Sequence, residues 1–262
     1  MSSNNITEEV HNEWKTVWMS FMAGASSSLL TYAFRKFWNS TIHSDDLNAA
    51  KTGAIVASST ADRRKQIKKE LIIISKVGIY GGVLWSTRSF VTQFLMPVRD
   101  RSVSTQTSMY VHVLAGSVSG AMERLVAYLC GDTLSFQTMG RLIGRSTLSY
   151  ALYRWLSSRQ VLQHILVSSV VSVGENNGSS TSPTTTREVS HWLGHFLTAA
   201  VISIGTHLCC NFASYRSSAH YLNYFNLLRE GIAGGIVYTS YEMVLDELKE
   251  MKNARITSMS SQ

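Results

Sequence analysis

Apolar residues gather into long blocks along this chain, and polar residues fill the segments between them. The apolar blocks cover residues 14–38, 71–96, 113–132, 140–173, 191–212 and 227–248. Several approach the roughly 20 residues that a helix needs to cross a bilayer. Hydrophobic residues make up 45% of the chain and charged residues 16%, which is apolar for a soluble protein. The pattern therefore predicts an all-α membrane protein with six transmembrane helices.

The polar segments predict the tails and loops of a single membrane domain over residues 1–262. They are a polar N-terminal tail (1–13), a basic loop (39–70), a disordered Ser/Thr-rich loop (174–190) and a polar C-terminal tail (249–262). Polar residues 157–160 interrupt the fourth block. Residues 137–173 therefore form either one long helix or two helices.

Small residues recur at four-residue spacing within most blocks. This spacing places them on one helix face, where the backbone of a neighbouring helix can approach closely. The glycines expected to pack helices together in this way are Gly78, Gly82, Gly116, Gly120, Gly140, Gly144, Gly231 and Gly235.

Among the charged residues of the apolar blocks, we expect Arg88, Glu123, Arg124 and Glu242 to lie within the membrane. A charge within a bilayer is costly and normally faces protein, water or another charge. Glu123 and Arg124 are adjacent and point about 100° apart on a helix. We therefore expect each to pair with a residue of another helix, with Arg88 and Glu242 as candidates.

The chain has a net charge of +7, and its basic residues are concentrated between the first two blocks. Such a loop is expected to set membrane topology and to bind anionic lipid. No nucleic-acid-binding fold accompanies the charge, so nucleic acid is not an expected partner. No cofactor is expected either, although a bound lipid such as cardiolipin is compatible with the loop. The residues concerned are Arg63, Arg64, Lys65, Lys68 and Lys69.

Residue types that commonly serve metal binding or catalysis are present without the partners such chemistry needs. His191 and His195 share a helix face but have no nearby carboxylate or Cys-x-x-Cys pair, so we interpret them as interfacial histidines. Three cysteines form no disulfide framework. The sequence contains no phosphate-binding loop, dinucleotide fingerprint or nucleophile elbow. An enzyme is therefore not expected.

A weak internal repeat relates the even-numbered blocks to one another. Lys76 and Arg88 are twelve residues apart, and Arg141–Tyr153 and Arg229–Tyr241 keep the same interval. The first and third blocks each contain an Ala-Gly pair, at residues 23–24 and 115–116. The repeat predicts three similar helix pairs.

At these positions the chain resembles the mitochondrial carrier family. The similar stretches are FMAGASSSLLTYAFRKF (21–37), LAGSVSGAMERLVAYLCGD (114–132) and LLREGIAGGIVYTSYEMVLDEL (227–248). The resemblance implies three helix pairs around a central cavity and a place in the mitochondrial inner membrane. The polar, acidic N-terminus is unlike a cleavable presequence.

The chain departs from the carrier pattern at the ends of its odd helices. Carriers place a proline there, with an acidic residue two positions later, and the acids pair with basic residues to close a gate. The corresponding triplets here are Ala33-Phe34-Arg35, Leu129-Cys130-Gly131 and Leu208-Cys209-Cys210. The departure favours a carrier-like protein that does not transport. It would be a structural or accessory subunit of an inner-membrane complex, bound to neighbouring membrane subunits and lipid.

A second resemblance implies a different function. YGGVLWST (80–87) and FRKFWNS (34–40) are similar to the channel-subunit family of inner-membrane protein translocases. The alternatives are thus a translocase component and a divergent solute transporter. A water-filled central cavity lined by Arg88, Glu123 and Arg124 would favour transport, whereas a centre filled by side chains would exclude it.

Overall fold

The computed structural model of the chain is built from six helices. It describes residues 3–42, 60–96, 105–133, 135–158, 183–217 and 224–260, and these residues contain no strand. The prediction of an all-α fold with six helices is therefore confirmed. The helices are α1 (Ser3–Ile42), α3 (Thr60–Leu95), α4 (Thr105–Leu129), α5 (Phe136–Ser158), α7 (Pro183–Ser217) and α8 (Tyr224–Ser260).

The helices extend well beyond the apolar blocks. α1 begins within the expected N-terminal tail, and α8 runs through the expected C-terminal tail to Ser260. α3 begins at Thr60, so residues 60–70 of the expected basic loop are helical, and α7 includes residues 183–190 of the Ser/Thr-rich segment. The polar ends of α3 and α8 are rich in Lys, Arg, Glu and Met, which favour helix. Residues 43–59 and 159–182 lie outside the described part of the chain.

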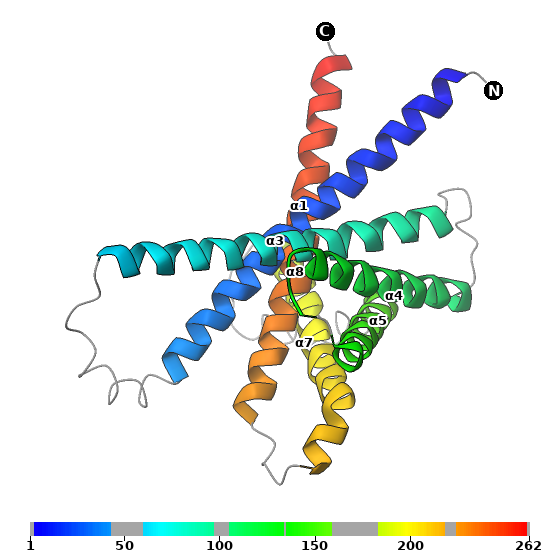
Figure 1. Cartoon of the computed structure of the whole chain (residues 1–262). Coiled ribbons are helices and arrows are strands. Elements are labelled where there is room, and N and C mark those ends of the chain that lie inside the picture. Colours follow the sequence, from blue (N-terminus) through cyan, green and yellow to red (C-terminus); the bar gives the residue numbers. More distant parts are fainter. Residues whose placement is uncertain are drawn as a thin grey trace.

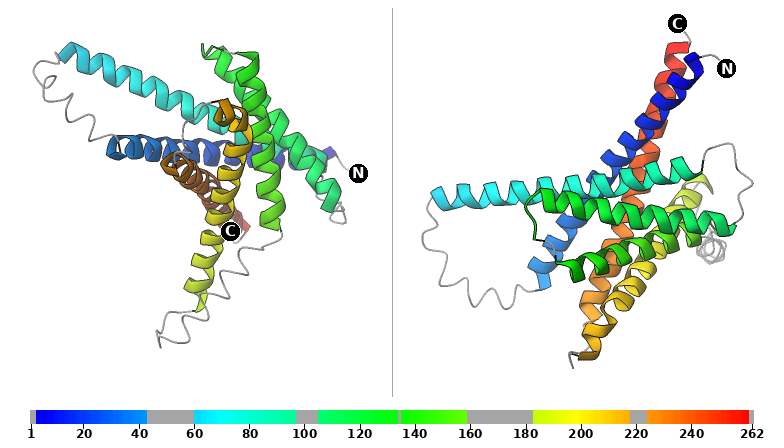
Figure 2. Two further views of the ribbon diagram at one scale, coloured as in Figure 1. Left: turned by 90° about the horizontal axis from the view of Figure 1, so that it is seen from below. Right: turned by 45° about the vertical axis from the view of Figure 1, so that its right-hand side comes forward.

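The six helices form a closed ring in sequence order. Each helix contacts the helices before and after it in the chain, and α8 contacts α1 to close the ring. The helices converge at the centre and their ends splay apart (Figure 1). Both termini lie on the same side of the molecule (Figures 1 and 2).

The α1–α3 and α7–α8 pairs use the same interface, residue for residue. A Cβ atom on Gly81 would overlap the Ser28 hydroxyl, and one on Gly234 would overlap the Ser203 hydroxyl. One residue further along each helix, Gly82 and Gly235 lie against phenylalanine rings, those of Phe21 and Phe196. Close approach of the two backbones therefore requires a glycine at each of these positions.

The α4–α5 pair repeats this interface with its two small residues exchanged. A Cβ atom on Gly120 of α4 would lie 3.1 Å from the Cβ atom of Ser146 on α5. The glycine thus belongs to the first helix of the pair and the serine to the second, the reverse of the other two pairs. Gly116 occupies the place of Gly24, with Ser146 O 3.4 Å from its would-be Cβ. Three copies of one helix–helix contact therefore join the two helices within each pair, and three further contacts between pairs close the ring.

The outer surface of the ring is strongly apolar. Trp18, Phe94, Leu129 and Val201 are each at least 60% exposed. By length and composition, one stretch among the described residues could cross a membrane, His191–Cys210 in α7. The structure thus establishes an all-helical protein with one candidate membrane span.

Candidate functional site

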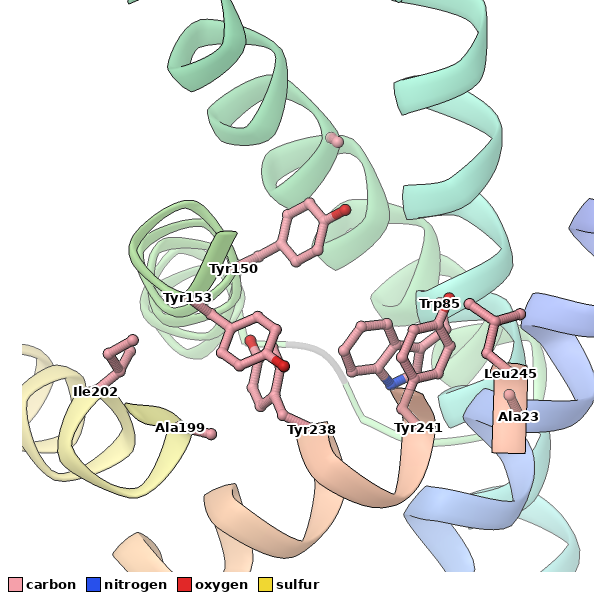
Figure 3. Packing of buried hydrophobic residues seen from close by; sticks show 10 residues of the cluster. Ala23, Trp85, Tyr150, Tyr153, Ala199, Ile202, Tyr238, Tyr241 and Leu245 are labelled. Carbon is pink, nitrogen blue, oxygen red and sulfur yellow. The ribbon is translucent and has the colours of Figure 1, made fainter. Parts of the chain in front are cut away.

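The centre of the ring is occupied by five aromatic side chains from α3, α5 and α8. This aromatic layer consists of Trp85, Tyr150, Tyr153, Tyr238 and Tyr241, each no more than 5% exposed (Figure 3). Trp85, Tyr150 and Tyr238 occupy equivalent places in the three helix pairs, as do Arg88, Tyr153 and Tyr241. The twelve-residue repeat in the sequence therefore marks the helices whose side chains meet at the centre.

The aromatic layer is packed through direct ring contacts between different helices. Trp85 stacks on Tyr241 with ring centroids 3.7 Å apart, and Tyr238 meets the Trp85 ring edge-on at 5.2 Å. Tyr153 lies 4.2 Å from Tyr238 between ring centroids. Such pairs add to the free energy gained by burying the rings.

Arg88 is built into the same layer. Its guanidinium carbon lies 4.7 Å from the Trp85 ring centre and 4.6 Å from that of Tyr150. Its Nε donates to the Ser119 hydroxyl at 3.2 Å and its Nη2 to the Ser146 hydroxyl at 2.8 Å. Arg88 therefore joins α3 to α4 and α5 through cation–π contacts and charge-assisted hydrogen bonds.

A first chamber of about 400 Å³ lies on one side of the aromatic layer, where Trp85 and Tyr238 face it. All six helices contribute to its wall, including Ser28 of α1 and Ser203 of α7. The charged residues that line it are Arg35, Arg88, Arg124, Arg145, Glu123 and Glu230. The sequence pointed to Arg88, Glu123 and Arg124. Positive charge exceeds negative charge in this wall.

The ion pairs inside the ring differ from those expected. Arg124 donates to Glu123 itself, with Nη2 and Oε1 3.0 Å apart. The expectation that each would pair with another helix is wrong, because long side chains can bend across the 100° between neighbouring positions. Glu242 pairs instead with Arg154 at 3.1 Å, beyond the aromatic layer.

Sequence reasoning missed the most highly charged part of the chamber wall. Glu230 of α8, with a side chain 6% exposed, pairs with Arg35 of α1 at 2.9 Å and with Arg145 of α5 at 2.7 Å. Arg229 approaches its second oxygen at 3.4 Å. Arg35 and Glu230 are 195 residues apart, and no local sequence signal brings them together.

A second chamber of about 570 Å³ lies on the other side of the aromatic layer, where Tyr150 and Tyr241 face it. Hydroxyl groups of α1 and α3 line much of its wall, together with Arg154 and His195. His195 Nδ1 lies 2.8 Å from the Tyr153 hydroxyl, a hydrogen bond that links α7 to α5. The aromatic layer thus separates two polar chambers.

The predicted packing glycines divide into two groups. Six lie at helix contacts: Gly78, Gly82, Gly116, Gly120, Gly231 and Gly235. Gly140 and Gly144 are exposed, and no atom of another helix would lie within 4 Å of a Cβ on either residue. The packing prediction is therefore wrong for these two, since the early turns of α5 have no close neighbour on that face.

The basic residues of the expected first loop lie on the first turns of α3. Arg64, Lys65, Lys68 and Lys69 are exposed there, and the Arg63 side chain lies outside the described residues. Glu70 turns instead toward α1, where Lys36 approaches it at 2.9 Å. The hydrogen bond from Lys36 lowers the pKa of the Glu70 carboxyl below its ordinary value.

The described residues contain no cluster of three or more His, Cys, Asp or Glu side chains that could hold a metal ion. Cys130, Cys209 and Cys210 are free thiols. His191 and His195 lie together, with ring centroids 4.6 Å apart. No protein-family model, curated protein or solved structure matches this chain.

Proposed function

We propose that this protein is a carrier-like membrane protein that binds a small anion in the first chamber. The side-chain-filled centre of the ring argues against passage of the anion through it. The observation that carries the proposal is the wall of that chamber, where four arginines and two glutamates converge from five helices. Its volume of about 400 Å³ is that of a small-molecule site. The excess positive charge of this wall attracts an anion, and the attraction is stronger at partly buried arginines than between charges in bulk water.

The arrangement of polar and apolar side chains supports a membrane location for the ring. Large apolar residues are exposed on the outside, whereas Arg88, Glu123 and Arg124 line the chamber and Glu242 pairs with Arg154. Intramembrane charges normally take this inward orientation. We propose a location in the mitochondrial inner membrane, the compartment that the carrier resemblance implies.

Water access to the first chamber tests the proposal. Leu84 lines the chamber, and Leu148 of α5 is 38% exposed on the ring. With the three native cysteines replaced by serine, Leu84→Cys should react in membranes with a charged methanethiosulfonate reagent. Leu148→Cys, which does not line the chamber, should not react. An anionic reagent should label Leu84→Cys faster than a cationic one.

Absence of labelling at Leu84→Cys, or equal labelling at both sites, would count against a water-filled chamber. A faster reaction with the cationic reagent would reject the anion preference.

The aromatic layer favours a second candidate, the structural or accessory subunit. Five buried rings close the centre of the ring between the two chambers. The first helix of each pair (α1, α4 and α7) also lacks the proline and acid with which carriers open and close. A large detergent-resistant complex on native gels would support this candidate, and purification only as a monomer would oppose it.

A further inference from the structure

Three arginines from three helices converge on a single carboxylate in the wall of the first chamber. Arg35 and Arg145 share one oxygen of Glu230, at 2.9 Å and 2.7 Å, and Arg229 approaches the other oxygen at 3.4 Å. Arg229 is also anchored to Asn39 at 3.1 Å. This triarginine cluster, Arg35, Arg145, Arg229 and Glu230, joins α1, α5 and α8.

The triarginine cluster has more positive charge and more donors than Glu230 can satisfy. Three guanidinium groups around one carboxylate leave an excess of two positive charges. Each guanidinium has five N–H donors, whereas a carboxylate accepts about four hydrogen bonds in all. Among the described residues, the buried Nε atoms of Arg35 and Arg229 have no hydrogen-bond partner.

Two of the three arginines are accessible from the chamber. Arg35, Arg145 and Glu230 all line it, and the side chains of Arg35 and Arg145 are 44% and 31% exposed. Arg229 is not part of the chamber wall and contacts the other oxygen of Glu230. A solute in the chamber would therefore meet Arg35 and Arg145 first.

We propose that Arg35 and Arg145 bind a small doubly charged oxyanion, a phosphate or a dicarboxylate, with Glu230 as the counter-ion that holds the empty site together. The proposal rests on the proposed function, because it names the class of anion that enters the first chamber. The guanidinium fork matches the geometry of carboxylate and phosphate oxygens. A ligand with two negative charges balances the excess of two positive charges in the cluster. A ligand with one negative charge would balance only half of that excess.

Glu230 has a role in this proposal that a purely structural ion pair would not have. Its carboxylate competes with the incoming oxyanion for the same guanidinium groups. Glu230→Gln should therefore strengthen anion binding by severalfold, whereas Arg35→Gln or Arg145→Gln should weaken it by tenfold or more. The opposite signs of these effects separate a ligand site from a cluster that only joins helices.

Isothermal titration of the full chain in detergent, with inorganic phosphate, succinate and acetate, tests the site. Phosphate or succinate should bind at least tenfold more tightly than acetate. Which of the two dianions binds more tightly shows whether the site prefers a phosphate or a dicarboxylate. Arg141→Gln is the matched control, since Arg141 is exposed one turn earlier on α5 and does not line the chamber. The double variant Arg145→Gln with Glu230→Gln avoids an unpaired buried charge and should also lose binding.

Equal affinity for acetate, equal effects of Arg141→Gln and Arg145→Gln, or weaker binding in Glu230→Gln would each overturn the proposal. Labelling of Leu84→Cys without binding of any dianion would reject this site and leave the chamber in place. If dianion binding depends on Arg145 but Leu84→Cys is not labelled, the binding site at Arg35 and Arg145 is supported. The proposal that the anion reaches it through a water-filled first chamber is then contradicted.

Discussion

At the scale of single residues, the structure separates glycines that the fold requires from glycines that it tolerates. Gly81 and Gly140 each lie on the second helix of a pair, in α3 and α5. A Cβ on Gly81 would overlap Ser28 and lie 2.7 Å from the Gly24 carbonyl oxygen, whereas one on Gly140 would meet open space. The same substitution should therefore have opposite effects at the two positions.

Gly81→Ala should destabilise the protein by about 1–3 kcal/mol, because α1 and α3 must move apart to admit the methyl group. Gly140→Ala should instead be neutral or stabilise by about 0.5–1 kcal/mol, the difference in helix propensity. Thermal unfolding of both variants in one detergent provides the measurement. Equal loss of stability in both would show that the interface is looser than the structure has it.

The exchanged serine and glycine of the α4–α5 pair predict a rescue. Gly81→Ser alone should destabilise α1–α3 packing, because two hydroxymethyl groups would occupy the same space. Adding Ser28→Gly should restore most of the lost stability, because the pair then has the α4–α5 arrangement. Adding Ser203→Gly, in the α7–α8 pair, should not. A double-mutant cycle measures the coupling, and equal rescue by both second substitutions would contradict the prediction.

At the scale of helices, Arg88 determines how α3 meets α4 and α5. Arg88→Met keeps most of the side-chain volume but removes the hydrogen bonds to Ser119 and Ser146 and both cation–π contacts. Hydrogen bonds to a charged group contribute about 1.5–3 kcal/mol, so a loss of that order is expected on thermal unfolding. Lys65→Met, at an exposed site of the same helix, is the control. Equal unfolding temperatures of the Arg88→Met and Lys65→Met variants would show that Arg88 does not stabilise the contact of α3 with α4 and α5.

The helices and their pairing could be predicted from the sequence, while the contacts between side chains could not. The helices were predicted from the apolar blocks, and their pairing from repeated intervals such as that from Arg141 to Tyr153. Both are periodic patterns that can be read from a single sequence. The ion pair between Glu123 and Arg124 depends on the side-chain rotamers of both residues, and a sequence contains no information on these rotamers. Arg35, Arg145 and Glu230 meet only after the ring closes, so their cluster is a consequence of tertiary structure. The polar helix ends were missed because apolar periodicity marks buried turns and not exposed ones.

At the scale of the whole molecule, the first turns of α3 project away from the ring (Figures 1 and 2). Exposed Ile67 and Leu71 lie beside the basic residues of this segment, at 60% and 58% exposure. An amphipathic basic segment of this kind is suited to an anionic lipid surface. The lipid prediction from the sequence therefore concerns a projecting helix and not a loop.

Cardiolipin added to the detergent-solubilised protein should raise its unfolding temperature more than phosphatidylcholine does. Replacing Arg64, Lys65, Lys68 and Lys69 by glutamine should remove that difference, since each basic residue contributes about 1 kcal/mol near an anionic surface. Higher salt should weaken the effect in the unmodified protein. Lys249→Gln with Lys252→Gln, at the far end of α8, is the control. A cardiolipin effect that survives the fourfold replacement would place the lipid elsewhere.

The exchange of serine and glycine between facing helices has a consequence for how this chain can change during evolution. The space at each interface belongs to a pair of positions, 28 with 81, 120 with 146, and 203 with 234. A larger residue on one helix is acceptable only when its partner becomes smaller. Descendants of this sequence should therefore vary at these positions in coupled pairs. A comparison of single helices would miss this relationship, because the serine and glycine can exchange places. A comparison of helix pairs would show it, because each pair keeps one small and one larger residue at the contact.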